Sequence, residues 1–291
     1  MKLSIVLATK NEETNIAHCL NSVKNIADEI IVVDEESTDN TRELAKSFRA
    51  KVYTTKHNPI FHITKQMAID KASGEWVLQL DADEVVTKEL ALEIIEVINS
   101  NSQDLDKRTI ADAGFSKFKN ANLFVRHQKN LQKRDGQIGQ LSGDVVAFFI
   151  PRKNMFLGKP LTYAGVYPDA VIRLLKKGKA YLPAKSVHEQ MAIDGRVGWL
   201  ENSLEHHDSP TLKRYLMRMN RYTDLNVEEF KSLNLPKNFI YLMLYTTYKP
   251  ATYFLKLFIR HKGFKDGLRG FLWCLLSALH FPLAYYKYYT S

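Results

Sequence analysis

Trp76-Val77-Leu78-Gln79-Leu80-Asp81-Ala82-Asp83-Glu84 is the stretch that decides the fold of this 291-residue chain. Its first five residues form a short, mostly apolar run of the kind found in buried strands, and three carboxylates follow within four residues. Mg²⁺ and Mn²⁺ prefer oxygen ligands and leave coordination positions open for substrate phosphates, so the carboxylates suit a cation that holds a diphosphate. An acidic turn that stabilises the N-terminus of the following helix would explain the same residues. The neighbouring segments distinguish these two interpretations.

Short apolar runs alternate with helix-like segments in the N-terminal part of the chain. We expect strands at 3–8, 30–33, 52–54 and 76–80, and helices at 14–23, 41–48 and 65–72. Strands that alternate with helices at this spacing form a mainly parallel sheet with helices on both faces. The expected fold class is therefore α/β. In such sheets, ligands bind beyond the carboxyl ends of the strands.

Polar residues stand at three of these strand ends. Thr9-Lys10-Asn11-Glu12 follow the first strand, Asp34-Glu35 follow the second, and Asp81-Ala82-Asp83 follow the fourth. No glycine-rich phosphate loop follows the first strand, so neither a dinucleotide-binding fingerprint nor a P-loop fits. The pattern favours a nucleotide that is held by side chains and a metal ion.

The positive charge of the chain is concentrated in its C-terminal tail. Residues 1–210 hold 28 Lys and Arg and 28 Asp and Glu, whereas residues 211–291 hold 13 and 4, so the whole net charge of +9 lies in the tail. The tail is also rich in Leu, Phe and Tyr, a combination that suits an anionic membrane surface better than nucleic acid. We therefore expect a membrane partner and no nucleic acid.

An apolar run at 271–286 is the most hydrophobic part of this tail. As a helix it would be about 24 Å long, shorter than the hydrocarbon core of about 30 Å. Aromatic residues suited to the membrane interface are Trp273, Tyr285, Tyr286, Tyr288 and Tyr289. We expect helices that lie in the cytoplasmic leaflet, with a helical subdomain packed on the rest of the protein as the alternative.

The domain organisation follows from these patterns. We expect a catalytic domain at 1–210 and a basic, amphipathic, helical, membrane-associated region at 211–291. Within the first domain, residues 101–142 are rich in basic residues and in glycines that break periodicity, so we expect an inserted basic loop there. The two cysteines, Cys19 and Cys274, match no metal or redox spacing and are expected to be structural thiols.

The ordered motifs resemble the family 2 glycosyltransferases. The first resemblance is carried by Ser4–Glu12, Ile31–Thr41 and Gly74–Glu84, which occur in order and at matching spacing. A closer likeness is to the bacterial branch that adds a sugar, often glucose, to the lipopolysaccharide inner core. That likeness is carried by Tyr167-Pro168-Asp169, Arg173-Leu174 and Val187-His188-Glu189. It covers most of the chain except about residues 100–142.

The resemblance implies a GT-A fold, which is Rossmann-like, with a mainly parallel mixed sheet flanked by helices. It also implies inverting transfer of a hexose from a nucleotide-sugar, expected to be a UDP-sugar, to a glycolipid or cell-surface polysaccharide. The expected place is the cytoplasmic face of the inner (plasma) membrane, with the protein peripheral or monotopic. The expected cofactor is Mn²⁺ or Mg²⁺.

The resemblance also implies which residues bind the donor. Thr9 and Asn11 would line the base and ribose pocket, and Asp34 would accept a hydrogen bond from the uracil ring, a role that Glu35 could share. Lys65 would reach the donor phosphates. A helix cap is the alternative role of Asp34, and a solvated lysine is the alternative for Lys65. The implied donor site also includes Ala8, Glu12, Ala82 and Arg173.

Metal and acid–base roles fall on carboxylates and one histidine. Asp81 and Asp83 would hold the metal and the ribose, with Asp83 the direct ligand, and His188 could complete the metal site. Inverting transfer needs a base that takes the proton of the acceptor hydroxyl, and Asp169 is the candidate. Glu189 is the competing base. The alternative for Asp169 is a structural ion pair with Arg173, one helical turn away if that segment is helical.

Two other functions remain open at this point. An enzyme that transfers sugar to a polyprenyl phosphate would use a phosphate as acceptor and would need no strong carboxylate base. A non-catalytic, basic, anion-binding or nucleic-acid-binding protein would explain the charged tail. The carboxylates at the strand ends argue against this last class.

Overall fold

The computed structural model describes residues 1–183 and 190–291. The chain forms two compact units. The first unit contains Met1–Arg152 and Pro168–His206, and the second contains Lys153–Tyr167 and His207–Ser291. The second unit therefore includes the whole of the region 211–291 together with two short preceding segments.

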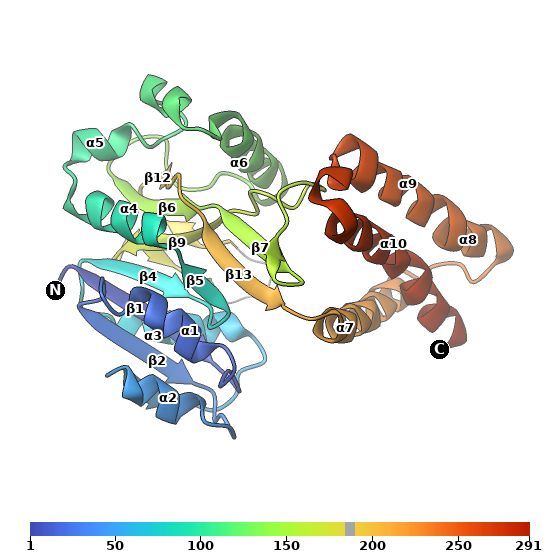
Figure 1. The fold of residues 1–291 in the computed structure, drawn as a ribbon, viewed down its shortest axis with the longest axis horizontal. Coiled ribbons are helices and arrows are strands. Elements are labelled where there is room, and N and C mark those ends of the chain that lie inside the picture. The colour runs from blue at the N-terminus through green and yellow to red at the C-terminus, as the bar shows by residue number, and fades with distance from the viewer. Residues whose placement is uncertain (184–189) are drawn as a thin grey trace. The chain divides into compact units, whose positions relative to one another are not determined.

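A mixed sheet forms the centre of the first unit (Figure 1). Its seven strands, among the described residues, lie in the order β12-β6-β9-β4-β1-β2-β3. Parallel pairing joins β4, β1, β2 and β3, while β9 runs antiparallel between β4 and β6. The strands are β1 (Leu3–Thr9), β2 (Glu29–Asp34), β3 (Lys51–Thr54), β4 (Trp76–Leu80), β6 (Val145–Ile150), β9 (Val171–Lys176) and β12 (Arg196–Trp199). The expected α/β class with a mixed, partly parallel sheet is confirmed.

Helices cover both faces of this sheet. The helices in the N-terminal part are α1 (Ile16–Val23), α2 (Thr41–Ser47), α3 (Phe61–Lys71) and α4 (Lys88–Asn99). The predicted helix at 65–72 therefore begins four residues earlier. Its buried face consists of Thr64, Lys65, Ala68 and Ile69, so two of its four buried residues are polar. That mixture hides the apolar periodicity by which a helix is predicted.

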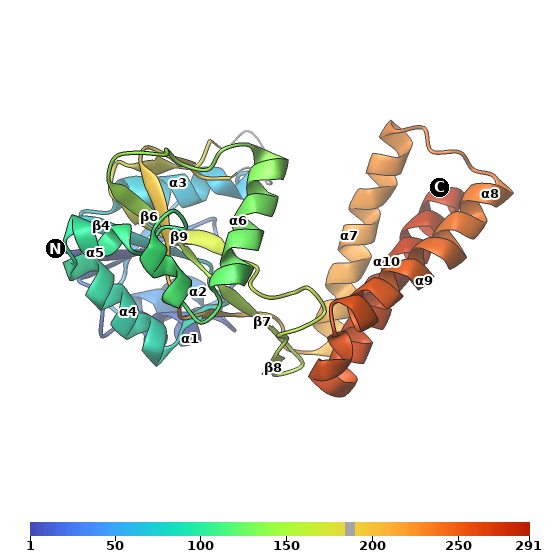
Figure 2. The same ribbon diagram turned by 90° about the horizontal axis from the view of Figure 1, so that it is seen from above.

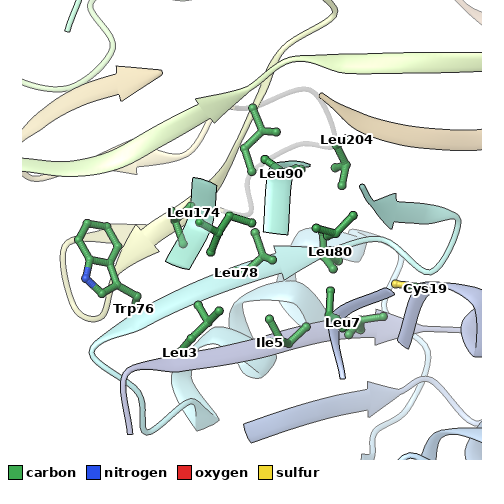
Figure 3. Close-up of a cluster of buried hydrophobic side chains, with 14 of the residues drawn as sticks. Leu3, Ile5, Leu7, Cys19, Trp76, Leu78, Leu80, Leu90, Leu174 and Leu204 are labelled. Carbon is green, nitrogen blue, oxygen red and sulfur yellow. The ribbon is translucent and has the colours of Figure 1, made fainter. Parts of the chain in front are cut away.

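Two apolar clusters pack on opposite faces of the sheet. Figure 3 shows the first, in which Leu3, Ile5 and Leu7 of β1 meet residues of β4, α4 and β9. Val6 of β1 points the other way and joins a cluster that contains Trp199. All seven residues of β1 are buried. Alternate residues of a strand face opposite sides, so a strand covered on both faces reads as a continuous apolar run.

The segment at 101–142 contains helices, which differs from the expected loop. These are α5 (Ser102–Asp106), the 3₁₀ turn η1 (Ala113–Lys117) and α6 (Ala121–Asp135). Phe124 of α6 is fully buried and stacks on Trp199 with ring centroids 4.5 Å apart. Trp199 also donates a hydrogen bond from Nε1 to Gln128 Oε1 at 2.7 Å. A few buried anchors therefore order a segment in which basic residues outnumber acidic ones by eight to four.

Each unit also contains short paired strands. In the first unit, β5 (Glu84–Val86) pairs antiparallel with the start of β13 (Leu204–Ser209), and β10 (Ala180–Tyr181) pairs with β11 (Ala192–Ile193). In the second unit, the end of β7 (Arg152–Phe156) pairs with β8 (Lys159–Pro160). Both cysteines are buried and free.

The second unit is mainly helical (Figure 2). Its helix α10 packs against α7 and α9, and Gly270 of α10 lies so close to the Gly263 carbonyl that a Cβ atom would overlap it. Tyr285 and Tyr288 of α10 are buried. The helical segments are α7 (Leu212–Ser232), α8 (Phe239–Met243), η2 (Leu244–Tyr248), α9 (Lys249–Leu255), η3 (Lys256–Arg260), η4 (Gly263–Asp266) and α10 (Gly267–Thr290).

Helix α10 is longer than the apolar run that predicts it. It covers 24 residues, and the helical stretch Gly263–Thr290 is, among the described residues, long and apolar enough to cross a membrane. The expectation that this segment is too short to span is therefore not supported by its length. Length and composition alone do not place it in a membrane.

Candidate active site

The loop after β2 is organised by Asp34, the last residue of that strand. Its carboxylate is fully buried. It accepts hydrogen bonds from Thr9 Oγ1 at 2.9 Å, from Ser37 N at 2.8 Å and from Ser37 Oγ at 2.5 Å. Asp34 thus joins the ends of β1 and β2 to the turn that follows. These bonds fix the turn after β2 and do not cap α2 (Thr41–Ser47), whose N-cap is Asn40.

Glu35 and Asn11 extend this rim of hydrogen bonds. Glu35 is fully buried, accepts a bond from Thr64 Oγ1 at 2.5 Å and lies 2.6 Å from His57 Nδ1. Asn11 has a positive φ of 54° and accepts a bond from Thr38 N at 2.9 Å. The loops after β1 and β2 are therefore connected to each other and to α3 by hydrogen bonds.

Asp81, the first residue after β4, contacts two cationic side chains. Lys65 Nζ of α3 lies 2.5 Å from Asp81 Oδ1, and Arg173 Nη2 of β9 lies 2.5 Å from Asp81 Oδ2. Burial by itself would raise the pKa of Asp81, but Arg173 and Lys65 outweigh it and hold that pKa well below its usual range. Asp81 is therefore ionised and bound to protein cations.

Glu84 is the first residue of β5, and its side chain is bonded to the backbone of Asp81. It is fully buried, and its Oε2 accepts a bond from Asp81 N at 2.9 Å. Its Oε1 accepts from Arg173 Nη2 at 2.7 Å and lies 3.3 Å from Arg152 Nη1. Burial would lower the pKa of both arginines, but the nearby carboxylates raise it instead. Two carboxylates, Asp81 and Glu84, and three cationic side chains, those of Lys65, Arg152 and Arg173, thus converge at the carboxyl end of β4.

Asp83 takes a different position from Asp81. Its Oδ2 lies 3.6 Å from His206 Nε2, which belongs to the start of β13. The antiparallel register of β13 and β5 places His206 opposite Glu84. The carboxylate of Asp83, two positions along the chain from Asp81, and the imidazole of His206 therefore lie together.

Asp169 precedes β9 in a left-handed backbone conformation with φ of 33°. Arg152 donates to its carboxylate at 2.8 Å and to its backbone carbonyl at 3.2 Å. The carboxylate is 39% exposed, so it can be reached from solvent. The segment that follows is a strand, so the helical turn expected between Asp169 and Arg173 is not formed. Arg173 instead binds Asp81 and Glu84.

The comparisons with known proteins decide the family. A sequence model described as glycosyl transferase family 2 matches residues 4–157, which is more than half of the chain. The chain belongs to glycosyltransferase family 2. It is therefore a transferase with the GT-A fold, and the first unit contains the mixed sheet flanked by helices that this fold requires.

Two relatives of this glycosyltransferase show how far the similarity reaches. The lipopolysaccharide core biosynthesis glycosyltransferase LpsC of Rhizobium meliloti is 24% identical over 99% of this chain and 92% of LpsC. An uncharacterized glycosyltransferase of Rickettsia typhi is 47% identical over 103 residues, or 35% of each chain. The match thus spans about a third of the length of the rickettsial relatives.

Two solved structures have a distant likeness. Glucosyl-3-phosphoglycerate synthase from Mycobacterium tuberculosis, solved with Mn²⁺, UDP and glucosyl-3-phosphoglycerate, has a TM-score of 0.30 and 23% identity over 35% of this chain and 41% of that chain. TarS of S. aureus has a TM-score of 0.41 and 18% identity over 92% of this chain and 46% of that chain. At these scores, the likeness adds nothing to the family assignment.

Most of the predicted site residues of this glycosyltransferase lie at the ends of β1, β2 and β4, together with some residues that were not among them. Ala8, Thr9, Asn11, Glu12, Asp34 and Glu35 lie at the joined ends of β1 and β2, while Lys65, Asp81, Ala82, Asp83 and Arg173 lie around the end of β4. The predicted site residues did not include Arg152, His206 or Gln79, whose Oε1 accepts a bond from Arg173. His188 and Glu189 lie outside the described residues.

Proposed function

We propose that this glycosyltransferase transfers a hexose, with inversion, from a UDP-sugar to a glycolipid or cell-surface polysaccharide. The observation that carries the proposal is the group of Asp81, Asp83 and Glu84 at the carboxyl end of β4, where Lys65 and Arg173 bind Asp81 and Arg173 also binds Glu84. A strand end that carries both cationic and acidic groups suits a donor diphosphate and a cation together. The similarity to LpsC along nearly the whole chain supports a lipopolysaccharide core acceptor.

Asp83 and His206 fit a divalent cation in this proposal. Mn²⁺ accepts both carboxylate and imidazole ligands, whereas Asp81 is occupied by Lys65 and Arg173. Among the described residues, no three His, Cys, Asp or Glu side chains form a metal-binding group. A cation held by Asp83 and His206 would therefore need substrate oxygens and water in its remaining positions. When bound, such a cation stabilises the negative charge that develops on the departing nucleoside diphosphate.

Lys65 and Arg173 have a second role in the proposal. Their positive charges lie at the same strand end, so donor phosphate oxygens can compete with Asp81 for them. A diphosphate that binds there replaces one set of charge-assisted hydrogen bonds by another. Asp81 would then be released toward the ribose and the cation, which agrees with its expected role.

Asp169 is the proposed base that takes the proton of the acceptor hydroxyl. Its side chain is accessible, and two hydrogen bonds from Arg152 fix the position of the residue. Glu189 is the alternative base. In either case, the base acts as the hydroxyl attacks the anomeric carbon on the side opposite the leaving diphosphate.

The proposed location is the cytoplasmic face of the plasma membrane, with the protein peripheral or monotopic. The excess positive charge of residues 211–291 supports attraction to anionic lipid. A glycolipid acceptor would be presented at the same surface.

A thermal-shift experiment tests the proposed donor. The intact protein is heated with UDP, other nucleoside diphosphates and UDP-hexoses, each with and without MnCl₂. A ligand that binds the native state raises the melting temperature by mass action. We expect the largest rise with a UDP compound and Mn²⁺ together. The absence of any rise with every nucleotide would contradict the proposal.

A further inference from the structure

The second unit exposes large apolar side chains around the turn that joins η3 to α10. Ile259 is 60% exposed, Phe264 is 50% exposed and Leu268 is 74% exposed, and Leu255 and Phe271 are exposed as well. We name these five residues the apolar tip. Large exposed apolar patches on soluble proteins commonly mark sites of interaction with proteins or membranes.

Four phenylalanine rings pack against one another at the apolar tip. The ring of Phe258 lies 6.1 Å from that of Phe264 and 5.9 Å from that of Phe271. Phe254 in turn lies 5.2 Å from Phe258 and 5.9 Å from Phe271. The exposed side chains of the apolar tip therefore lie next to a packed cluster of phenylalanine rings. A preformed surface loses little conformational entropy when it binds.

Basic residues alternate along the chain with those of the apolar tip. They are Lys256, Arg260, Lys262, Lys265 and Arg269. The structure records no ion pair between any of these five and another described residue. Asp266, the one acid in this segment, accepts hydrogen bonds from the backbone nitrogens of Thr162 and Tyr163 at 3.2 and 2.8 Å. The segment therefore presents a strong excess of positive charge next to its apolar side chains.

We propose that residues 255–271 insert into the headgroup region of an anionic phospholipid bilayer. The inference rests on the proposed function as a membrane-associated transferase and assigns the contact to one segment. Apolar side chains that enter the acyl boundary, with basic side chains that reach phosphate groups, are the features of an interfacial membrane anchor. Nucleic acid would match the charge but would leave the apolar tip in water.

Three residues near the C-terminal end of α10 are bonded to the rest of the unit. Tyr285 donates a hydrogen bond from its hydroxyl to Pro236 O at 2.8 Å, and Tyr288 donates to Leu235 O at 2.6 Å. Lys287 Nζ lies 2.6 Å from Asp224 of α7. Crossing a membrane with α10 exposed to lipid would break these contacts. Tyr285 and Tyr288 are therefore structural, and the aromatic residues that we assign to the bilayer are those of the tip.

Sedimentation with pure lipid vesicles tests the proposal on the full chain. The vesicles contain phosphatidylcholine with or without phosphatidylglycerol, and the variant carries Ile259→Asp and Leu268→Asp. We expect the wild type to bind only the anionic vesicles. We expect the variant to bind them more weakly than the wild type, by a factor of about ten or more. The matched control is Ile240→Asp in α8, which is 74% exposed near the opposite end of the helical segment 239–260. It should bind within about twofold of wild type.

A second variant locates the inserted segment. Phe264→Trp should give a blue-shifted emission with anionic vesicles, and brominated lipids should quench it. Equal loss of binding in Ile240→Asp, or resistance of the wild type to alkaline carbonate extraction, would overturn the proposal. Association with cell membranes but not with pure vesicles would also overturn it and would indicate a protein partner. Nucleotide thermal shifts without vesicles report separately on the proposed function.

Discussion

Arg173 Nη2 contacts Asp81 Oδ2 at 2.5 Å, and this ion pair joins β9 to the acidic end of β4. The same nitrogen donates to Glu84 Oε1 at 2.7 Å, so one guanidinium binds two carboxylates. β9 runs antiparallel to β4, which brings together residues separated by 92 positions. Arg173 therefore ties both Asp81 and Glu84 to the neighbouring strand β9.

Arg173→Gln tests the structural part of this relationship. We expect it to lower the free energy of unfolding by about 3 kcal/mol, because loss of one partner leaves buried carboxylates uncompensated. Glu84, which is fully buried, accounts for most of that cost. Urea unfolding followed by circular dichroism measures the change. Arg173→Lys retains the charge and should lose less, and equal losses in the two variants would contradict the bridging role.

The parallel strands β1, β2 and β4 were predictable because they are covered on both faces. Such strands read as continuous apolar runs, as in Val6 and its neighbours, and each ends in polar residues that mark the binding edge. The helix at 61–71 was predicted too short because Thr64 and Lys65 are part of its buried face. Polar residues that serve a site weaken the pattern by which an element is recognised.

The parts of the fold and of the site that were not predicted depend on contacts between segments far apart in the sequence. The antiparallel insertion of β9 places Arg173 beside Asp81, and the pairing of β13 with β5 places His206 near Asp83. No local pattern indicates either pairing. Composition also misled the prediction of an inserted loop at 101–142, where Phe115 and Phe124 anchor helices in the core. For the same reason, Tyr285 resembled an interfacial residue although it is buried.

Glu29 at the start of β2 should make stability depend on acid pH. Burial would raise its pKa, but hydrogen bonds from Lys51, Ser73 and Ser4 lower that pKa from 4.5 to about 2. A depressed pKa contributes stability that is present above pH 4.5 and is lost as the pH falls toward 2. We expect Glu29→Gln to destabilise the protein by about 3 kcal/mol at pH 7 and by much less near pH 2.

Urea unfolding of Glu29→Gln and wild type between pH 7 and pH 2 measures this difference. Glu75→Gln, at an exposed position, is the control and should change stability little at any pH. A stability difference for Glu29→Gln that does not change with pH would show that the charge of Glu29 is not its source.

His206→Ala should weaken Mn²⁺ binding by about tenfold, and Asp83→Ala should weaken it at least as much. Both side chains belong to the proposed cation site, at a separation of 3.6 Å. Electron paramagnetic resonance of free Mn²⁺ in the presence of UDP measures the affinity without any turnover. His207→Ala is the matched control, because neighbouring residues of a strand point to opposite sides. Unchanged affinity in His206→Ala would exclude that residue from the cation site.

Asp169→Asn should reduce hexose transfer by about a hundredfold or more while nucleotide binding is kept, because the amide cannot take the acceptor proton. Incorporation of labelled hexose from the UDP-sugar into glycolipid of cells that lack the protein measures transfer, and the thermal shift with UDP and Mn²⁺ measures binding. Arg152→Lys keeps a cation beside Asp169 and should reduce transfer less. If Asp169→Asn remains active while Glu189→Gln is inactive, Glu189 is the base and Asp169 only positions the chain before β9.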